Sequence, residues 1–222
     1  MCKCIFISVQ YPVALMIVKK LAIDGERLDY RRIDEQRLIE IERCTSSLLL
    51  SMGNTRVQVV FQSDVAKPYV DKPREGVVGF FASMAGRRHE KLLWFLNMVY
   101  VKQKCVDLEG MCVKAGKEVM RVHVDFRFLS IDGNVYSIAI AGVNAALSAI
   151  GVSMNFLPKC FLYCSVEGCI LSDPTDDEFD ACDWHCIVVM KSKKEVAFLE
   201  KIGDGCEMSA IDEIISRSGV SV

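Results

Sequence analysis

Hydrophobic and polar residues alternate regularly in the segment RVHVDFRFLS, Arg121 to Ser130. Its apolar positions are Val122, Val124, Phe126 and Phe128. A period of two predicts a β-strand with one face in a core and the other face polar. The turn sequence Asp132-Gly133-Asn134 follows, and Asn134 is a suitable N-cap for a helix.

Small residues dominate the segment that this turn introduces. They are Ala139, Ala141, Gly142, Ala145, Ala146 and Ala149. Because small side chains let two backbones approach closely, the segment predicts a helix packed tightly against a sheet or another helix.

Further elements follow from the same patterns. Residues 46–63 hold two β-rich runs around Gly53-Asn54, which predicts a hairpin. The charged, proline-containing residues 67–76 predict a loop, and residues 77–84 a strand. Apolar residues recur at helical spacing within residues 89–104, which predicts a buried helix.

The last third of the chain predicts two more hairpins, which turn at residues 166–168 and at Lys193-Lys194. Residues 208–219 predict an amphipathic helix, with Ser209 as its cap and Gly219 just past its end. These elements together indicate an α+β protein of one compact domain, built as two βα lobes.

The first 23 residues are unusually apolar. Gln10, Tyr11 and Pro12 interrupt the run, so it lacks the ~20 uninterrupted apolar residues of a membrane helix. A signal peptide is one interpretation, but its basic region would hold only Lys3 and no clean cleavage site follows. We favour a strand or helix that packs on the domain or on a partner.

Charge gives no global case for nucleic-acid binding, since 27 basic and 29 acidic residues leave a formal net charge of -2. Basic residues do gather locally, at Lys67, Lys72 and Arg74 and again at Arg87 and Arg88. Either group could contact phosphates, although charge on exposed loops is also explained by solvation alone.

The chain has 11 cysteines, most of them in apolar, strand-like runs. The odd number argues against a disulfide framework and favours a reducing compartment. Cys182, His185 and Cys186 form a C-x-x-H-C run, but no second ligand pair completes a zinc site. We favour buried thiols that pack as small apolar groups.

Acidic residues cluster from Asp173 to Glu178, with Asp180 and Asp183 just beyond. Such carboxylates could hold Mg²⁺ or act in acid–base chemistry. A solvated loop that turns at Asp173-Pro174 explains them without chemistry, and we favour it. The sequence contains no Walker loop, no G-x-G-x-x-G, no nucleophile elbow and no H-E-x-x-H.

Several motifs resemble the RNase PH family. They are RLDYRRIDEQR, the MGNTRV hairpin, LSDPTDDE, and the strand that ends in Asp-Gly before the small-residue helix. KPREGVVGFF and the segment KCVDLEGMCVKAGKEVMRVHVDFRFLSIDGN resemble one branch, the exosome core-ring subunits that include the polymyositis–scleroderma autoantigen. The resemblance runs from about Arg27 to the C-terminus. Tyr30 departs from it, since the family usually has glycine there.

This resemblance implies the RNase PH fold, which is similar to domain 2 of ribosomal protein S5. It divides the chain into an apolar N-terminal segment (1–25), a first lobe (26–157) and a second lobe (158–222). Active members of the family are phosphorolytic: phosphate attacks the 3′-terminal linkage of RNA and releases a nucleoside diphosphate. That chemistry needs cationic side chains for phosphate and carboxylates at the leaving oxygen.

The phosphate-binding positions of the family differ in this chain. After the Asp-Gly turn, active enzymes have Gly-Thr-Arg or a near equivalent, whereas this chain has Asn134-Val135-Tyr136. A second phosphate arginine of the family aligns with Met98. The resemblance therefore implies that the phosphate grip is lost.

The two catalytic aspartates of the family align with Phe179 and His185. A slip of one residue would bring Asp180 to the first position but Cys186 to the second. We therefore expect no catalytic residues, and we interpret Val135, Tyr136, Phe179 and His185 as degenerate active-site positions.

The resemblance predicts a non-catalytic structural subunit of the RNA exosome core ring. Its partners would be other RNase PH-type subunits, cap subunits, RNA and an associated nuclease, with no membrane, metal or cofactor. RNA contacts are expected from Lys72, Arg74, Arg87 and Arg88, and the protein is expected in the nucleus, its nucleolus and the cytoplasm. The alternatives are an active phosphorolytic 3′-to-5′ exoribonuclease forming a homo-oligomer and, with less support, a stand-alone RNA-binding module.

Overall fold

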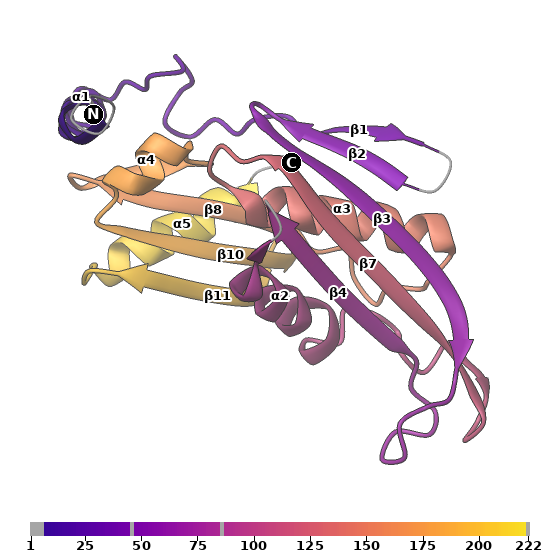
Figure 1. Ribbon diagram of the computed structural model, residues 1–222. Helices are drawn as coiled ribbons and strands as arrows, with labels where there is room; N and C mark the ends of the chain where they lie inside the picture. Colours follow the sequence, from indigo (N-terminus) through magenta and orange to yellow (C-terminus); the bar gives the residue numbers. More distant parts are fainter. Residues whose placement is uncertain (1–6, 45–46, 85–86, 221–222) are drawn as a thin grey trace.

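The computed structural model describes residues 7–44, 47–84 and 87–220. These residues form two β-sheets, built mainly of antiparallel strands, and several helices (Figure 1). The strands of the first sheet are β1 (Glu40–Arg43), β2 (Ser47–Met52), β3 (Thr55–Ala66), β4 (Val77–Met84), β5 (Arg87–Arg88), β6 (Cys112–Lys114) and β7 (Glu118–Ser130).

The first sheet has the strand order β1-β2-β3-β7-β4-β5, and β6 also pairs with β7. All pairs are antiparallel except β4 with β7, which run parallel. A parallel pair needs a crossover, and the chain makes it through α2 (Glu90–Asn97) and the π-helix η1 (Met98–Lys102).

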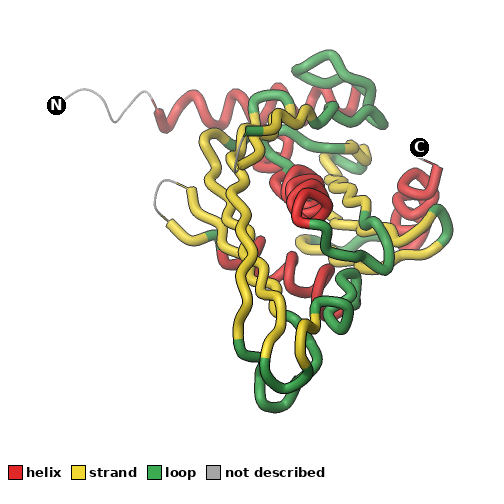
Figure 2. Tube along the Cα trace, turned by 90° about the vertical axis from the view of Figure 1, so that its right-hand side faces the viewer, coloured by secondary structure: helices red, strands yellow, loops and turns green. Residues whose placement is uncertain are grey.

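The second sheet is antiparallel, with the order β11-β10-β8-β9. Its strands are β8 (Lys159–Val166), β9 (Cys169–Ser172), β10 (Trp184–Ser192) and β11 (Glu195–Gly203). The other helices are α1 (Ile7–Asp24), α3 (Val135–Ile150), α4 (Asp176–Ala181) and α5 (Met208–Val220). Helices lie between the long strands of the first sheet and the strands of the second (Figure 2).

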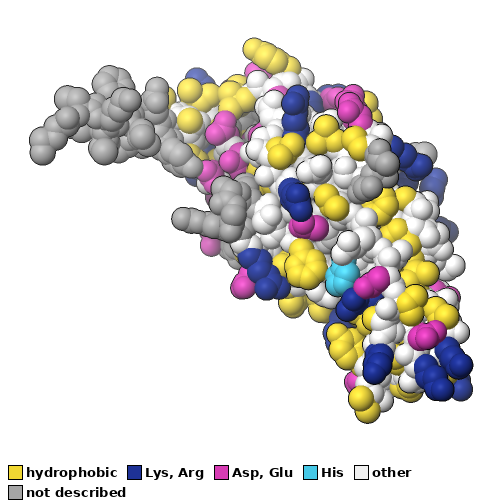
Figure 3. Space-filling model, turned by 45° about the vertical axis from the view of Figure 1, so that its right-hand side comes forward, with side chains coloured by type: hydrophobic (Ala, Val, Ile, Leu, Met, Phe, Trp, Pro, Cys, Tyr) yellow, Lys and Arg dark blue, Asp and Glu magenta, His cyan; other side chains and the backbone are white. Residues whose placement is uncertain are grey.

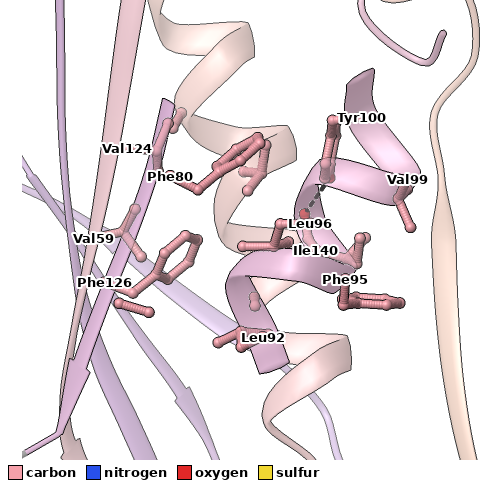
Figure 4. Close-up of a cluster of buried hydrophobic side chains, with 14 of the residues drawn as sticks. Val59, Phe80, Leu92, Phe95, Leu96, Val99, Tyr100, Val124, Phe126 and Ile140 are labelled. Carbon is pink, nitrogen blue, oxygen red and sulfur yellow. Dashed lines mark hydrogen bonds between the residues drawn. The ribbon is translucent and has the colours of Figure 1, made fainter. Parts of the chain in front are cut away.

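The main core joins both sheets through α2, η1 and α3 (Figure 4). As the alternation predicts, Val122, Val124, Phe126 and Phe128 of β7 are all buried in it. Gly142 of α3 faces this strand, and a Cβ there would lie 3.0 Å from Phe126. The prediction that the small-residue helix packs tightly against a sheet is therefore confirmed.

The predicted hairpins are all present, as β2–β3, β8–β9 and β10–β11. The predicted buried helix within residues 89–104 is also present, as α2 followed directly by the π-helix η1. Ser209 does not cap α5: it lies inside the helix and donates to Glu207, and Gly219 also lies inside.

The apolar N-terminal segment forms α1 over its described part, and residues 1–6 lie outside the described residues. Val18 and Ala22 of α1 pack against β8, β9 and α4, in a small cluster that includes Leu171 and Ala181. None of the helices described here has the length and apolar character needed to span a membrane.

Nine cysteines lie in the described ranges, and all nine are free thiols. Burial raises the pKa of Cys105 and of Cys160 to about 12. Within the same residues, no three histidine, cysteine or acidic side chains come close enough together to hold a metal ion. Thiols so placed contribute to packing in the way small apolar groups do.

Candidate functional site

The acidic run is an ordered, partly buried structure, so the interpretation as a solvated loop is wrong. Residues 176–181 form α4, which begins with a capping box: Glu178 N donates to Thr175 Oγ1, and Thr175 N donates to Glu178 Oε2. Asp173 and Glu178 are each only 2% exposed. Buried carboxylates need charged or hydrogen-bonding partners, and the charged segment near the N-terminus supplies them.

Arg27 is the partner of Glu178. Its Nε lies 2.8 Å from Oε1 and its Nη2 lies 2.6 Å from Oε2, which is the two-pronged geometry that suits a guanidinium and a carboxylate. The same guanidinium donates to the carbonyl oxygens of Ser172 and Asp173. This pair therefore ties the segment before β1 to the start of α4.

Asp173 is held by Arg37, Arg31 and Asn134. Arg37 Nε lies 2.8 Å from Oδ2 and Arg37 Nη2 lies 2.9 Å from Oδ1. Arg31 Nη1 donates to Oδ2 and Asn134 Nδ2 to Oδ1. Burial alone would raise the pKa of Asp173, but the hydrogen bonds and charge of Arg37 outweigh it and lower the pKa below its usual value.

These five charged residues, Arg27, Arg31, Arg37, Asp173 and Glu178, are called the arginine–carboxylate cluster below. The cluster also reaches the Asp132-Gly133 turn, because Arg37 Nη1 donates to the Asp132 carbonyl at 2.9 Å. Its arginines already have carboxylate partners, which leaves them poorly suited to grip a phosphate. The turn is therefore part of a structural junction.

Tyr30 sits in this junction with a φ of 60°, and its side chain is 98% exposed. A left-handed backbone costs a residue with a Cβ about 1–2 kcal/mol, whereas glycine adopts it freely. Tyr30→Gly is therefore expected to raise the free energy of unfolding by about 0.5–1 kcal/mol in urea titrations, after the entropy cost of glycine. Tyr69→Gly is the control: Tyr69 is exposed without a positive φ, so its replacement should not stabilise the protein.

A cleft of about 350 Å³ lies beside the junction. It is lined by the start of α3, by α4, by β10 and by the chain around the start of α2. Val135, Tyr136, Phe179 and His185 all line it, so the structure brings the four predicted degenerate positions together. We call it the α3–α4 cleft.

The walls of the α3–α4 cleft are largely apolar. Phe179 and His185 pack with ring centroids 4.6 Å apart, and His185 is 9% exposed. Burial, with smaller effects from Lys91 and Lys201, lowers the pKa of His185 to about 4, so the imidazole is neutral at physiological pH. Its Nε2 has no hydrogen-bond partner among the described residues.

Few charges line this cleft. Lys91 and Asp176 are the charged residues among its described lining, and none of that lining is arginine. Burial, together with Asp180 and Asp132, raises the pKa of Asp176. Met98 and Asp180, the other aligned positions, are not among the lining residues. One lysine beside one carboxylate is a weak site for phosphate.

The four residues expected to contact RNA do not form one site. Lys72 and Arg74 lie in the loop before β4, while Arg87 and Arg88 form β5 after it. The eight residues of β4 separate the two pairs by roughly 26 Å at 3.3 Å per residue.

Four lysines that the sequence analysis did not single out lie near Lys72 and Arg74. The Gly116 amide donates to the Pro73 carbonyl at 2.7 Å, which brings the hairpin with Lys114 and Lys117 beside the loop. Lys102 and Lys104 share a hollow with Lys72, which is ion-paired with Glu75, and the carboxylates of Asp107 and Glu109 line the same hollow. Lysine and arginine side chains gather at this end of the molecule (Figure 3). We call the six residues the basic tip: Lys72, Arg74, Lys102, Lys104, Lys114 and Lys117.

Comparison with known proteins adds independent information. No family model matches the chain. Among curated proteins it is similar to "Exosome complex component Rrp42" of Methanocella arvoryzae, 24% identical over 85% of this chain and 84% of the relative. It is also similar to rrp45 of Schizosaccharomyces pombe, 23% identical over 88% of this chain and 84% of the relative, and to human RRP45, 24% identical over 81% of this chain. The match spans half the length of human RRP45.

Solved structures show the same fold. A chain of the Archaeoglobus fulgidus exosome with RNA bound to the active site superposes with a TM-score of 0.82, at 23% identity over 94% of both chains. Rice Rrp46 superposes with a TM-score of 0.74, at 16% identity over 86% of this chain and 92% of that one. The chain has the α+β RNase PH fold, and over most of its length it is similar to the exosome components Rrp42 and Rrp45.

Proposed function

We propose that this chain is a non-catalytic structural subunit of an exosome core ring, which pairs with other RNase PH-type chains and helps guide RNA 3′ ends to a separate nuclease for 3′-to-5′ processing. The observation that carries this proposal is the α3–α4 cleft. Where phosphorolysis needs arginines and paired carboxylates, the cleft has Val135, Tyr136, Phe179 and His185.

Pairing with other chains is supported by apolar side chains that α1 leaves on its outer face. Met16 is 70% and Ile23 is 67% exposed, which is unusual for apolar groups that recur along one helix. We propose that the N-terminal segment, residues 1–25, presents this surface, and that the rest of the chain forms two lobes, residues 26–157 and 158–222. The basic tip at one end of β4, and Arg87 and Arg88 at the other, would contact RNA phosphates.

The cap subunits and the separate nuclease would belong to the same exosome assembly as this chain. By similarity to the eukaryotic relatives, the protein would act in the nucleus, with its nucleolus, and in the cytoplasm. This role involves no cofactor bound to the chain.

The test has two parts. The purified chain, incubated with RNA and millimolar phosphate, is expected to release no nucleoside diphosphate, while an active phosphorolytic ribonuclease in the same buffer does. Native mass spectrometry of the tagged chain from its own cells is expected to show one copy each of several different RNase PH-type chains.

Two outcomes would contradict the proposal. Phosphate-dependent release that disappears in Asp180→Asn or Asp183→Asn would establish an active phosphorolytic enzyme. A homohexamer in native mass spectrometry would indicate an independent oligomer in place of a mixed ring.

A further inference from the structure

One end of the second sheet carries a lysine-rich surface. Lys159 begins β8, Lys191 lies near the end of β10, and Lys193 and Lys194 form the turn between β10 and β11. Glu195 is the one carboxylate in the segments 155–159 and 190–196. Four positive charges and one negative charge leave a local balance of +3, in a chain whose formal net charge is -2. We call the four lysines the lysine platform.

The lysine platform surrounds a small hollow of about 200 Å³. Lys159 and Lys191 both line it, because β8 and β10 are neighbours and Lys159 lies opposite Met190. The remaining lining residues are Leu157, Met190, Ser192, Lys193, Ser218 and Gly219. A hollow of this size suits a single side chain, whereas sites for whole small molecules begin at about 300 Å³.

Packing holds the surface around the hollow in place. A Cβ at Gly219 would lie 2.6 Å from the Lys193 carbonyl oxygen, so the last turn of α5 lies directly against the turn between β10 and β11. Lys191 Nζ lies 5.6 Å from the centre of the Phe156 ring and 2.8 Å from Glu195 Oε1. Because these contacts order the backbone turn and one lysine before a partner arrives, they lower the entropy cost of binding.

An apolar group is exposed beside these charges. Leu157 is 57% exposed, and the buried Met190 lines the hollow next to it. An exposed leucine beside a hollow favours a partner that brings an apolar side chain of its own, because contact removes both apolar surfaces from water. The surrounding lysines favour carboxylates on the same partner, since opposite charges across an interface steer and orient binding.

The composition of the hollow favours a peptide over a nucleic acid. Surfaces that bind single-stranded nucleic acid combine cations with aromatic rings on which bases stack, and arginine is the cation that holds phosphate in two-pronged geometry. The described lining of the hollow contains neither an aromatic residue nor an arginine. The exposed Leu157 also has no role in binding phosphates, whereas it matches a peptide that is both acidic and apolar.

We propose that the lysine platform binds an acidic segment of a protein partner, whose carboxylates pair with Lys159, Lys193 and Lys194 while one large apolar side chain enters the hollow. The proposal goes beyond the role in an exosome ring, because the lysine platform shares no residue with the basic tip, with β5 or with the α3–α4 cleft. Ring assembly and peptide binding are measured separately, so either can fail without the other.

Fluorescence anisotropy of a synthetic peptide tests the site. The probe is a fluorescein-labelled glutamate peptide with one central leucine, titrated with the purified full chain at about 0.1 M salt. Saturable binding is expected. Lys159→Glu combined with Lys193→Glu is expected to weaken binding at least about tenfold, because two attractive contacts become repulsive. Both side chains are exposed, and circular dichroism would verify that the variant is folded.

Lys114→Glu combined with Lys117→Glu is the matched control. It makes the same charge change at two exposed lysines of the basic tip. The affinity for the peptide should change by less than about twofold, since charges more than ~10 Å apart are largely screened at this salt concentration. A loss equal to that of the lysine-platform variant would show that only the overall charge matters, and it would overturn the assignment of the site.

A second peptide, with glycine in place of the central leucine, tests the hollow. It is expected to bind about three- to tenfold more weakly, because less apolar surface is buried. The carbon-13 methyl signals of Leu157 and Met190 are expected to shift with the leucine peptide and to stay in place with the glycine peptide. Equal affinities together with unmoved methyl signals would overturn the proposal.

Three further results would also overturn the proposal. The first is the absence of saturable binding of the leucine peptide. The second is an oligouridylate RNA that binds more tightly than this peptide and loses affinity in the lysine-platform variant, which would assign the surface to RNA. The third is the same behaviour with phosphatidylserine vesicles, which would assign the surface to a membrane.

Discussion

Asp173→Asn is expected to lower the free energy of unfolding by about 3–5 kcal/mol, the cost of removing one partner from a buried ion pair. Asp173 is 2% exposed and accepts hydrogen bonds from Arg31 and Arg37. Asparagine keeps the shape of the side chain but removes its charge. Its amide group would face the guanidinium donors of Arg31 and Arg37. Urea unfolding followed by circular dichroism would measure the loss.

Asp177→Asn is the control for this experiment. Asp177 lies four residues further along in the same acidic run but is exposed, so its replacement should change the free energy of unfolding by less than about 1 kcal/mol. Equal stabilities for the two variants would show that the arginine–carboxylate cluster does not hold the fold together.

The pH dependence follows from the sign of the pKa shift. The pKa of Asp173 is lower in the folded protein than the usual ~3.9. The contribution of its carboxylate to the free energy of unfolding is therefore fully present at pH values above ~3.9. The contribution is lost as the pH falls through the lower, folded value. Acidification should therefore destabilise the wild-type protein more steeply than Asp173→Asn.

Gly133→Ala is expected to destabilise the protein by about 2–4 kcal/mol, from a strained backbone together with a steric clash. Gly133 has a φ of 78°, and a Cβ there would lie 2.1 Å from the Pro174 carbonyl oxygen and 2.8 Å from the Thr175 carbonyl carbon. Both neighbours are backbone atoms at the entrance to α4, so relief requires the junction to separate.

Gly116→Ala separates the two causes. Gly116 has a nearly equal φ of 72°, but a Cβ there would meet nothing within 4 Å. Gly116→Ala should therefore lower the free energy of unfolding only by the cost of the strained backbone, about 1 kcal/mol. Thermal unfolding of Gly133→Ala and Gly116→Ala would measure the difference in stability between them. Equal losses of stability would contradict a tight packing of the turn against α4.

Most of the fold could be predicted because its signals are local. Alternation in residues 121–130 indicates β7 directly, and the Gly-Asn turn at residues 53–54 indicates the β2–β3 hairpin. Asn134 was a predicted cap, and its Oδ1 does accept from the Ser137 amide. Each of these signals lies within a few residues of the element that it predicts.

The arginine–carboxylate cluster could not be predicted in the same way. Arg27, Arg31 and Arg37 lie in a charge-rich segment with few apolar positions, and their carboxylate partners are 136 to 151 positions away in the sequence. One missed signal was local: Thr175 and Glu178 have the spacing of a capping box, which marks the start of α4 within the acidic run. The apparent abundance of acidic residues hid that spacing.

The α3–α4 cleft itself was not predicted. The resemblance to the RNase PH family named only four of its lining residues, Val135, Tyr136, Phe179 and His185. His89, Lys91, Ile131 and Leu162 also line it, and their neighbourhood depends on how both sheets pack around α3. The π-helical form of η1 could not be predicted for a different reason: its residues repeat hydrophobicity much as an α-helix does.

The arginine–carboxylate cluster also constrains the order of events during synthesis on a ribosome. The cluster joins residues 136 to 151 positions apart, so Arg27, Arg31 and Arg37 emerge long before their partners. At translation rates of about 5–20 residues per second, the wait lasts roughly 7–30 s. Throughout that time the early strands can form hairpins, but the segment ahead of β1 lacks its carboxylate partners, and it can dock only after the chain has been made as far as Glu178.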